Sequence, residues 1–185
     1  MICIHDPLRR EARDAVAALH ACGIGKVVMM TGDNRQTAQA VARAVGVDAV
    51  YAEVLPEDKA AFIRSEKAAG HTVIMVGDGV NDSPALSEAD AGVAISTGAA
   101  IAREIADITI ASEDLFELVT LRRLSQALMA RIHRNYRFIV GFNLSLILLG
   151  VAGILPPTTS ALLHNMSTLG ISLKSMTDLQ LDQPQ

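Results

Sequence analysis

Several residue types that often mark function are scarce in this sequence of 185 residues. It contains no tryptophan, and aromatic residues make up only 3% of the chain, which excludes a surface on which successive bases stack. The formal net charge of -4 argues against nucleic acid as the main partner. The two cysteines, Cys3 and Cys22, form no C-x-x-C pair, so the sequence predicts neither a zinc ribbon nor a disulfide framework.

Charged side chains are missing altogether from residues 138–173. One membrane-spanning helix needs about 20 predominantly apolar residues. Two consecutive prolines divide the uncharged segment, so we expect a hairpin of two spans, residues 138–155 and 158–176. Several arginines precede the first span, and the positive-inside rule places that end in the cytoplasm. The alternative is one buried core helix followed by a loop.

The first 137 residues alternate short apolar runs with amphipathic segments. We expect strands at residues 26–30, 72–76, 91–95 and 108–110. We expect helices at residues 10–21, 35–45, 57–69 and 83–89, and one long helix at 115–137 that continues into the first span. Strand and helix alternation predicts a parallel sheet with helices on both faces. Functional groups gather at the carboxyl ends of the strands in such sheets.

The loop after the expected strand 72–76 reads Gly77-Asp78-Gly79-Val80-Asn81-Asp82. Glycine lets the backbone turn sharply and approach a ligand closely. We expect Asp78 and Asp82 to point into one crevice, with Asn81 between them. Such oxygen ligands suit Mg²⁺, which one or two carboxylates and phosphate oxygens usually hold. The alternative is a turn whose Asp and Asn side chains cap the next helix.

Two further segments carry candidate phosphate ligands. Thr31-Gly32-Asp33 follows the expected strand 26–30, where Thr31 can donate to a phosphate, or Asp33 and Asn34 can cap the next helix. Lys59 lies in the first turn of an expected helix, where a cation opposes the helix dipole. That position disfavours a purely structural role, although a solvated surface lysine is the alternative.

Taken in this order, the three segments resemble the haloacid-dehalogenase-like phosphoryl-transfer fold. A wider set of segments is similar to the phosphorylation domain of P-type ATPases: Asp6-Pro7, Met30-Thr31-Gly32-Asp33, Pro56-Glu57-Asp58-Lys59 and residues 77–86. The helix leading into an uncharged hairpin resembles the C-terminal end of the heavy-metal-transporting branch. The resemblance implies a partial haloacid-dehalogenase-like doubly wound parallel sheet followed by a transmembrane helical hairpin. The expected limits are 1–115 for the partial phosphorylation domain, 116–137 for a connecting helix, 138–176 for two membrane helices and 177–185 for a tail.

The resemblance also implies roles for individual residues. Thr31 and Lys59 would contact the transferred phosphoryl group, with Gly32, Asp33 and Asn81 completing the catalytic loops. Asp78 would bind Mg²⁺. Asp82 would lie beside it at the ion, and it would orient the site and hold the loop. The implied cofactors are Mg²⁺ and ATP.

The sequence departs from the family pattern at a decisive point. The phosphoryl acceptor of P-type ATPases is the Asp of an Asp-Lys-Thr-Gly-Thr segment, and no such segment occurs here. The chain therefore resembles only the C-terminal portion of an ATP-driven pump that exports a divalent transition metal across the plasma membrane, its soluble part cytoplasmic. Its partners would be the metal, the bilayer and the missing N-terminal part of the pump, and the isolated chain is expected to be inactive. The alternatives are a freestanding phosphatase of the same superfamily and a non-catalytic membrane module that binds metal or a partner.

Polar residues within the expected spans are candidates for the transported ion. Polar groups inside a span are costly and usually functional. Imidazole suits several transition metals, which favours His164 as a ligand. The family places metal-coordinating residues in both final helices, which implies Asn143 and His164 here. For Asn143, Ser167 and Thr168, hydrogen bonding between helices is the alternative.

Overall fold

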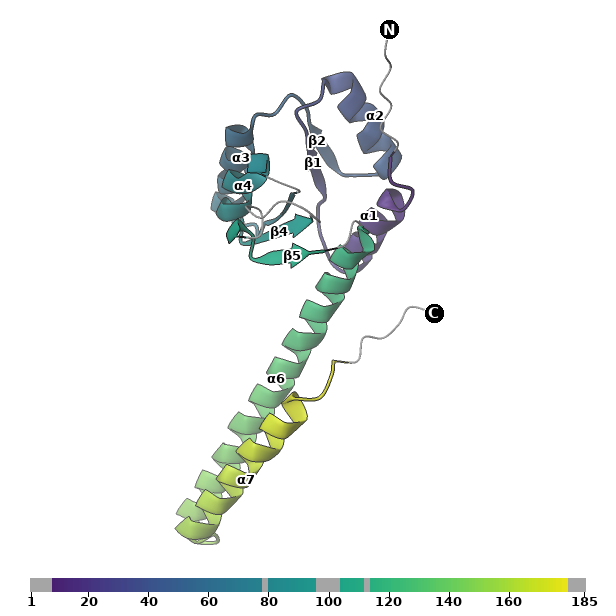
Figure 1. The fold of residues 1–185 in the computed structure, drawn as a ribbon. Helices are drawn as coiled ribbons and strands as arrows, with labels where there is room; N and C mark the ends of the chain where they lie inside the picture. Colours follow the sequence, from purple (N-terminus) through teal and green to yellow (C-terminus); the bar gives the residue numbers. More distant parts are fainter. Residues whose placement is uncertain (1–7, 78–79, 96–103, 112–113, 180–185) are drawn as a thin grey trace. The chain divides into compact units, whose positions relative to one another are not determined.

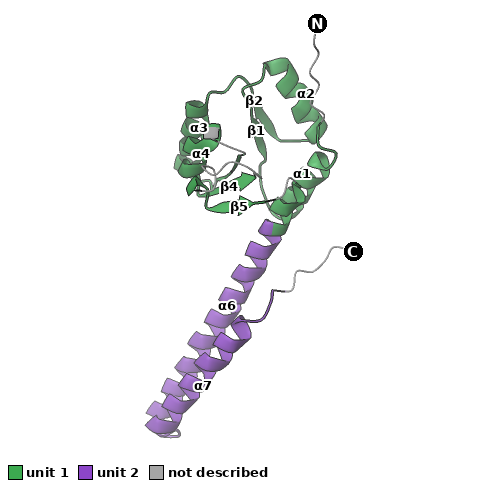
Figure 2. Ribbon diagram, in the orientation of Figure 1, with its two compact units in different colours: residues 1–120 green, residues 121–185 purple. Residues whose placement is uncertain are grey.

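The computed structural model describes residues 8–77, 80–95, 104–111 and 114–179. The chain divides into two compact units, residues 1–120 (unit 1) and 121–185 (unit 2), coloured separately in Figure 2. The predictions for Asp6-Pro7, Asp78 and Gly79 lie outside the described residues.

Unit 1 alternates strands and helices along the chain, as the sequence predicts (Figure 1). Its elements are α1 (Ala12–Ala21), β1 (Val28–Met30), α2 (Arg35–Val45), β2 (Ala49–Tyr51), α3 (Pro56–Ala68), β3 (Ile74–Gly77), the 3-10 helix η1 (Val80–Asp82), α4 (Ser83–Glu88), β4 (Ala91–Ile95) and β5 (Ile108–Ile110). Each expected strand and helix of this part of the chain has its counterpart. The strand β2 is additional, since the sequence analysis expects no strand at these residues.

Every strand pairing in the described part of unit 1 is parallel. The strands form two sheets, β1-β2 and β3-β4-β5, and no pairing joins β1 to β3 among the described residues. The predicted parallel α/β arrangement is confirmed, while its continuity as a single sheet is not observed. The core of unit 1 includes Ile63 of α3, Leu86 of α4 and Val93 of β4, whose side chains are fully buried.

Local sequence explains where two helices of unit 1 begin and end. Asn34 caps α2, because its Oδ1 accepts a hydrogen bond from the N–H of Thr37 at 3.0 Å. Gly46 ends the same helix with a left-handed φ of 82°. Pro56 occupies the first turn of α3, where a missing N–H costs no hydrogen bond. These termini fix the loop that carries Thr31 and the first helical turn that carries Lys59.

Unit 2 contains most of α6 (Phe116–Val151) and all of α7 (Pro157–Ser175). The long helix expected to continue past residue 137 is confirmed as one element. It ends at Val151 rather than 155, and Gly153 with φ 72° lies in the turn that follows. Within the described residues, no helix combines the length and the apolar character that a bilayer crossing requires.

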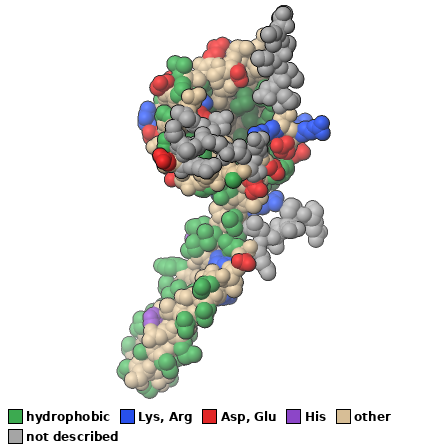
Figure 3. All heavy atoms as spheres, in the orientation of Figure 1, with side chains coloured by type: hydrophobic (Ala, Val, Ile, Leu, Met, Phe, Trp, Pro, Cys, Tyr) green, Lys and Arg blue, Asp and Glu red, His purple; other side chains and the backbone are tan. Residues whose placement is uncertain are grey.

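The two helices of unit 2 are held together by polar contacts near the C-terminal end of α7. The Arg131 guanidinium donates to the carbonyl oxygens of Ser175, Thr177 and Asp178 at 3.3, 2.5 and 2.8 Å. The Asn135 side-chain amide donates to the Ser175 hydroxyl at 2.9 Å. Many large apolar side chains of α6 and α7 are exposed, and hydrophobic atoms gather along both helices in Figure 3.

Candidate functional site

The central feature of the candidate site is an ion pair between Lys59 and Asp82. The Lys59 ammonium donates to Asp82 Oδ1 at 2.7 Å, and the side chains are only 16% and 12% exposed. Lys59 comes from the first turn of α3, and Asp82 from the end of η1. Lys59 is therefore not a solvated surface lysine. Because an ammonium has three donors, it can bind an anion while keeping its bond to Asp82.

A glycine makes this pairing possible at the carboxyl end of β3. A Cβ added to Gly77 would lie 2.8 Å from Asp82 Cβ and 2.9 Å from Asp82 Oδ2. The Asp82 side chain therefore packs directly against the backbone of the strand. Close backbone approach was the predicted use of glycine in this loop, and here the approaching group is the carboxylate of the same loop.

Thr31 and Asp33 form a second, local pair after β1. The Thr31 hydroxyl donates to Asp33 Oδ2 at 2.8 Å, and the Asp33 N–H donates to Thr31 Oγ1 at 3.1 Å. Asn34 caps the following helix, as the capping alternative predicts, whereas the Asp33 side chain accepts from Thr31 instead. Gly32 and Asp33 are exposed, so this loop faces solvent.

Backbone hydrogen bonds connect the two pairs through one short segment. The Val54 N–H donates to Thr31 O at 3.1 Å, and the Lys59 N–H donates to Leu55 O at 3.3 Å. Thr31 and Lys59 are thus attached to adjacent residues of the loop between β2 and α3. The described side chains form two pairs, Thr31–Asp33 and Lys59–Asp82, rather than a single bonded cluster.

The predicted Mg²⁺ ligands are Asp78 and Asp82, and Asp82 ends the 3-10 helix η1. Asp78 lies outside the described residues, and Asn81 is exposed. Asp82 Oδ1 is engaged by Lys59, which suits an orienting role and leaves its second oxygen for an ion. No group of three or more His, Cys, Asp or Glu side chains that could hold a metal occurs among the described residues.

Ser83 is a further candidate residue that the sequence analysis does not single out. Its hydroxyl oxygen is buried directly after Asp82 and has no hydrogen-bond partner among the described residues. A buried hydroxyl without a partner is costly, which makes Ser83 a further candidate donor at this loop. A serine at the start of a helix is common for capping reasons alone. The sequence therefore gives no indication that Ser83 differs from an ordinary helix-terminal serine.

The two candidate ion ligands of unit 2 are in direct contact. His164 Nδ1 lies 2.8 Å from Asn143 Oδ1, so α7 and α6 meet through these side chains. An amide oxygen only accepts hydrogen bonds, so Nδ1 carries the proton in this contact and Nε2 holds the lone pair. No partner of Nε2 is observed in the described part of the chain. The contact is also the hydrogen bond between helices that the packing alternative predicts.

Neighbouring hydroxyls in α7 do not bridge the helices. Ser167 and Thr168 both donate to the carbonyl oxygen of His164 within the same helix, at 2.8 and 3.0 Å. Such bonds satisfy the hydroxyls locally. His164 and Asn143 therefore differ from Ser167 and Thr168, because their contact joins two helices.

Comparison with known families agrees with the architecture of unit 1. A family model described as haloacid dehalogenase-like hydrolase matches residues 1–90. Together with the parallel strands and the polar loops at their carboxyl ends, this match supports a haloacid-dehalogenase-like α/β fold for this part of the chain.

Individual relatives narrow the assignment. The chain is 44% identical to Copper-transporting ATPase 2 of Rhizobium meliloti (strain 1021) over 163 residues, covering 88% of this chain and 20% of that protein. It is 42% identical to the Copper-exporting P-type ATPase of Staphylococcus aureus (strain JH9) over 171 residues, covering 92% and 21%. The crystal structure of a zinc-transporting PIB-type ATPase in its E2.Pi state matches with a TM-score of 0.85 and 31% identity, covering 92% of this chain and 28% of that one. The chain is similar over most of its length to heavy-metal P-type ATPases, and it spans about a fifth of the length of these curated relatives.

Proposed function

We propose that this chain is the C-terminal portion of an ATP-driven heavy-metal pump. Unit 1 supplies the second half of its phosphorylation domain, and α6 and α7 supply its last two membrane helices. The domain limits are those expected from the sequence: 1–115, 116–137, 138–176 and 177–185. The absence of charged residues from 138–173 and the exposed apolar side chains of α6 and α7 support the membrane assignment. The soluble part then lies on the cytoplasmic side of the plasma membrane.

The largely buried Lys59–Asp82 pair carries the catalytic part of this proposal. Phosphoryl transfer passes through a loose transition state whose charge spreads over three equatorial oxygens. Lys59, held by Asp82, offers its remaining N–H groups to those oxygens, and the Thr31 hydroxyl can turn from Asp33 to a phosphoryl oxygen. Asp78 and the second oxygen of Asp82 would hold Mg²⁺, which supplies positive charge against the phosphate. The acceptor aspartate belongs to the rest of the pump.

A chimera tests these roles. The chain replaces its matching segment in the Staphylococcus aureus copper-exporting relative, and acid-stable phosphoenzyme is measured after incubation with labelled ATP. Lys59→Ala should lower the phosphorylation rate about 100-fold, because a preorganised donor to the transition state is lost.

Lys67→Ala is the matched control, since Lys67 lies on the same helix but pairs with Asp90 at 3.4 Å, away from Lys59. Equal phosphorylation by the two variants would contradict the role of Lys59. The chimera without further substitutions is also compared with the host pump for resistance to trypsin, which reports whether it is folded. A chimera that is as resistant as the host pump but forms no phosphoenzyme would contradict the proposed function itself.

We also propose that His164 contacts the transported ion through Nε2, while Asn143 holds the imidazole ring in place. Copper and zinc, named for the relatives, are both metals that imidazole binds. A hydrogen bond from Nδ1 fixes the tautomer that presents a lone pair on Nε2. Asn143 is then a positioning residue for the ligand.

In the chimera, His164→Ala should lower metal affinity more than about tenfold, and Asn143→Ala should lower it about tenfold. Phosphorylation from inorganic phosphate should survive in both, because unit 1 is intact. His133→Ala is the control, since that ring bonds only to Met129 O of its own helix among the described residues. Unchanged metal affinity per folded molecule in His164→Ala would assign the residue to packing.

A further inference from the structure

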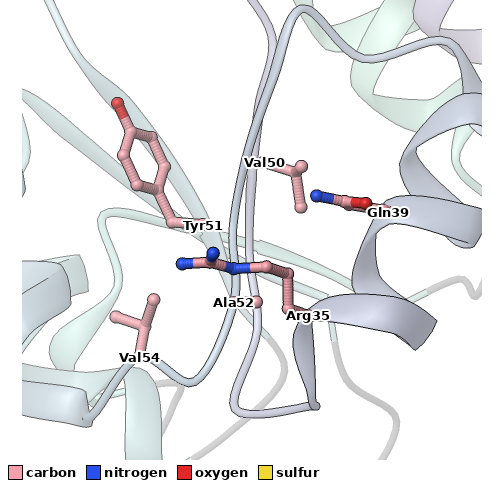
Figure 4. Close-up of a pocket in the computed structure, with 6 residues that line it drawn as sticks. All are labelled: Arg35, Gln39, Val50, Tyr51, Ala52 and Val54. Carbon is pink, nitrogen blue, oxygen red and sulfur yellow. The ribbon is translucent and has the colours of Figure 1, made fainter.

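An open cavity lies between α2 and β2, beside Arg35 (Figure 4). Arg35 and Gln39, which line it, are both exposed to solvent. Water satisfies exposed polar groups, so this cavity gives no indication of a ligand. The charged surface of unit 2 is more informative.

Basic residues gather in unit 2 where the sequence has no acidic ones. Residues 118–177 contain five arginines and one lysine but no Asp or Glu, and Asp178 is the first acidic residue after them. Arg131 is occupied, because its guanidinium donates to three carbonyl oxygens at the end of α7. Arg134, Arg137 and Lys174 are exposed. This part of the chain therefore carries an excess of positive charge at its surface.

Two contacts fix the register of α6 against α7. The Asn135 amide donates to the Ser175 hydroxyl at 2.9 Å, and His164 Nδ1 lies 2.8 Å from Asn143 Oδ1. Residue numbers rise along α6 as they fall along α7, so the two helices are antiparallel. They lie side by side in Figure 1.

This register brings the exposed basic residues to one level. Arg134 and Arg137 flank Asn135 on α6, and Lys174 directly precedes Ser175 on α7. At a helical rise of about 1.5 Å per residue, the three basic residues lie within roughly 5 Å of one another along the helix axes. We call Arg134, Arg137 and Lys174 the cationic band.

The cationic band marks the boundary of the uncharged segment on both helices. Residues 138–173, which follow the band on α6 and precede it on α7, contain no charged side chain. The charged surface therefore ends at the same level on two helices that are far apart in the sequence. A bilayer imposes such a common level, because its hydrocarbon core begins at one plane. Tyr136 lies at this level and is 64% exposed, and tyrosine is enriched at membrane–water interfaces.

We propose that the cationic band binds anionic phospholipid headgroups such as phosphatidylglycerol. Arg134 and Arg137 are three residues apart, which places them on one face of α6, within reach of the same phosphate. A guanidinium can donate two parallel N–H bonds to a phosphate, and Lys174 adds a further positive charge. A zwitterionic lipid fits less well, because its own ammonium group offsets its phosphate. This inference rests on the proposed membrane assignment of α6 and α7, and it adds the class of lipid that they bind.

The test uses the full chain with Tyr51→Phe, which leaves Tyr136 as the single tyrosine in a chain without tryptophan. The protein is reconstituted into phosphatidylcholine vesicles, and its resistance to extraction by alkaline carbonate reports insertion. Phosphatidylglycerol or phosphatidylcholine with a nitroxide near the top of one acyl chain is then added. A lipid held at the cationic band brings its nitroxide close to Tyr136, so quenching of the tyrosine fluorescence measures association.

We expect labelled phosphatidylglycerol to associate at least about threefold more strongly than labelled phosphatidylcholine, because basic residues at the membrane surface attract anionic lipids. The preference should fall sharply at about 1 M salt, where the Debye length is about 3 Å. Replacing all three residues of the cationic band by glutamine should make the association of the two lipids equal. The matched control removes the same charge from three exposed arginines of unit 1 and should keep the preference: Arg10→Gln, Arg13→Gln and Arg43→Gln.

The outcomes separate this inference from the proposed function. Equal quenching by the two lipids in an inserted chain would overturn the lipid inference alone, and would leave an acidic segment of another protein chain as the partner of the cationic band. A preference that persists without the cationic band, or that the control loses equally, would also overturn it. A chain that carbonate removes from the vesicles would contradict the membrane assignment itself, and this inference with it.

Discussion

The contact between Gly77 and Asp82 leads to a prediction that can be worked out from distances. In Gly77→Ala the new Cβ would lie 2.8 Å from Asp82 Cβ and 3.1 Å from Asp82 Cγ. Comfortable contacts between carbon atoms are about 3.5–4.0 Å, so a gap of roughly 0.7–1 Å must open. Asp82 cannot swing aside freely, because its side chain is 12% exposed and bonded to Lys59 at 2.7 Å.

Forced overpacking of this kind costs about 1–3 kcal/mol. In a chain of this size, each kcal/mol lowers Tm by about 2–4 °C, so Gly77→Ala should lower Tm by roughly 2–12 °C. Gly92→Ala should cost at least as much, because its Cβ would lie 2.7 Å from the backbone oxygen of Leu86, which cannot rotate away. Gly25→Ala is the control, since nothing lies within 4 Å of its added Cβ.

The assay is urea and thermal unfolding of the full chain, followed by Tyr51 fluorescence in a Tyr136→Phe background. This signal reports on unit 1, where Tyr51 packs on Phe62. The expected order of destabilisation is Gly92→Ala, then Gly77→Ala, then Gly25→Ala. If Gly77→Ala were as stable as Gly25→Ala, Asp82 would not be held against β3, and the geometry argued for the Lys59–Asp82 pair would be refuted.

Two further predictions concern other parts of the chain. The pKa of Asp90 is lowered from its usual 3.8, because its carboxylate accepts a hydrogen bond from the Val73 N–H and lies near Lys67. A lowered folded-state pKa stabilises the fold above the unfolded-state pKa, and this contribution is lost as pH falls through the folded-state value. Asp90→Asn should therefore flatten the decline of stability below about pH 4 in urea titrations, and an unchanged profile would contradict this. Arg131→Ala removes three bonds to carbonyls at the end of α7, so it should cost about 1–2 kcal/mol and speed amide exchange there, with unchanged exchange as the contrary result.

The sequence was sufficient to predict the order of the elements of unit 1 other than β2 and η1, and the loops that carry the candidate site. Apolar runs bounded by glycine mark β1 and β3, and the carboxyl ends of parallel strands are where polar loops gather. Thr31 and Asp33 are close because they are neighbours in the chain. Asp78 and the Mg²⁺ ligand set stay predictions, since Asp78 lies outside the described residues.

The pairing of Lys59 with Asp82 could not be read from the sequence. It depends on how α3 packs beside η1 and on the missing Cβ of Gly77. The local sequence indicates neither of these features. The cavity near Arg35 was hidden for the same reason, because β2 forms one of its walls and that strand was not predicted. The end of α6 at Val151 was missed because hydropathy continues to residue 155, whereas helix geometry ends before Gly153.

The strand pairing of unit 1 bears directly on the acceptor that this sequence lacks. Among the described strands, β1 is bonded only to β2 and β3 only to β4, so each has a free edge beside the loop that holds Thr31 or Asp82. Ile74 and Val76 of β3 are 46% and 38% exposed, whereas parallel strands are normally covered on both faces. Under the proposed function, a strand from the rest of the pump would pair with these edges. A parallel strand there would end beside the same loops, so one segment would both complete the sheet and deliver the acceptor carboxylate.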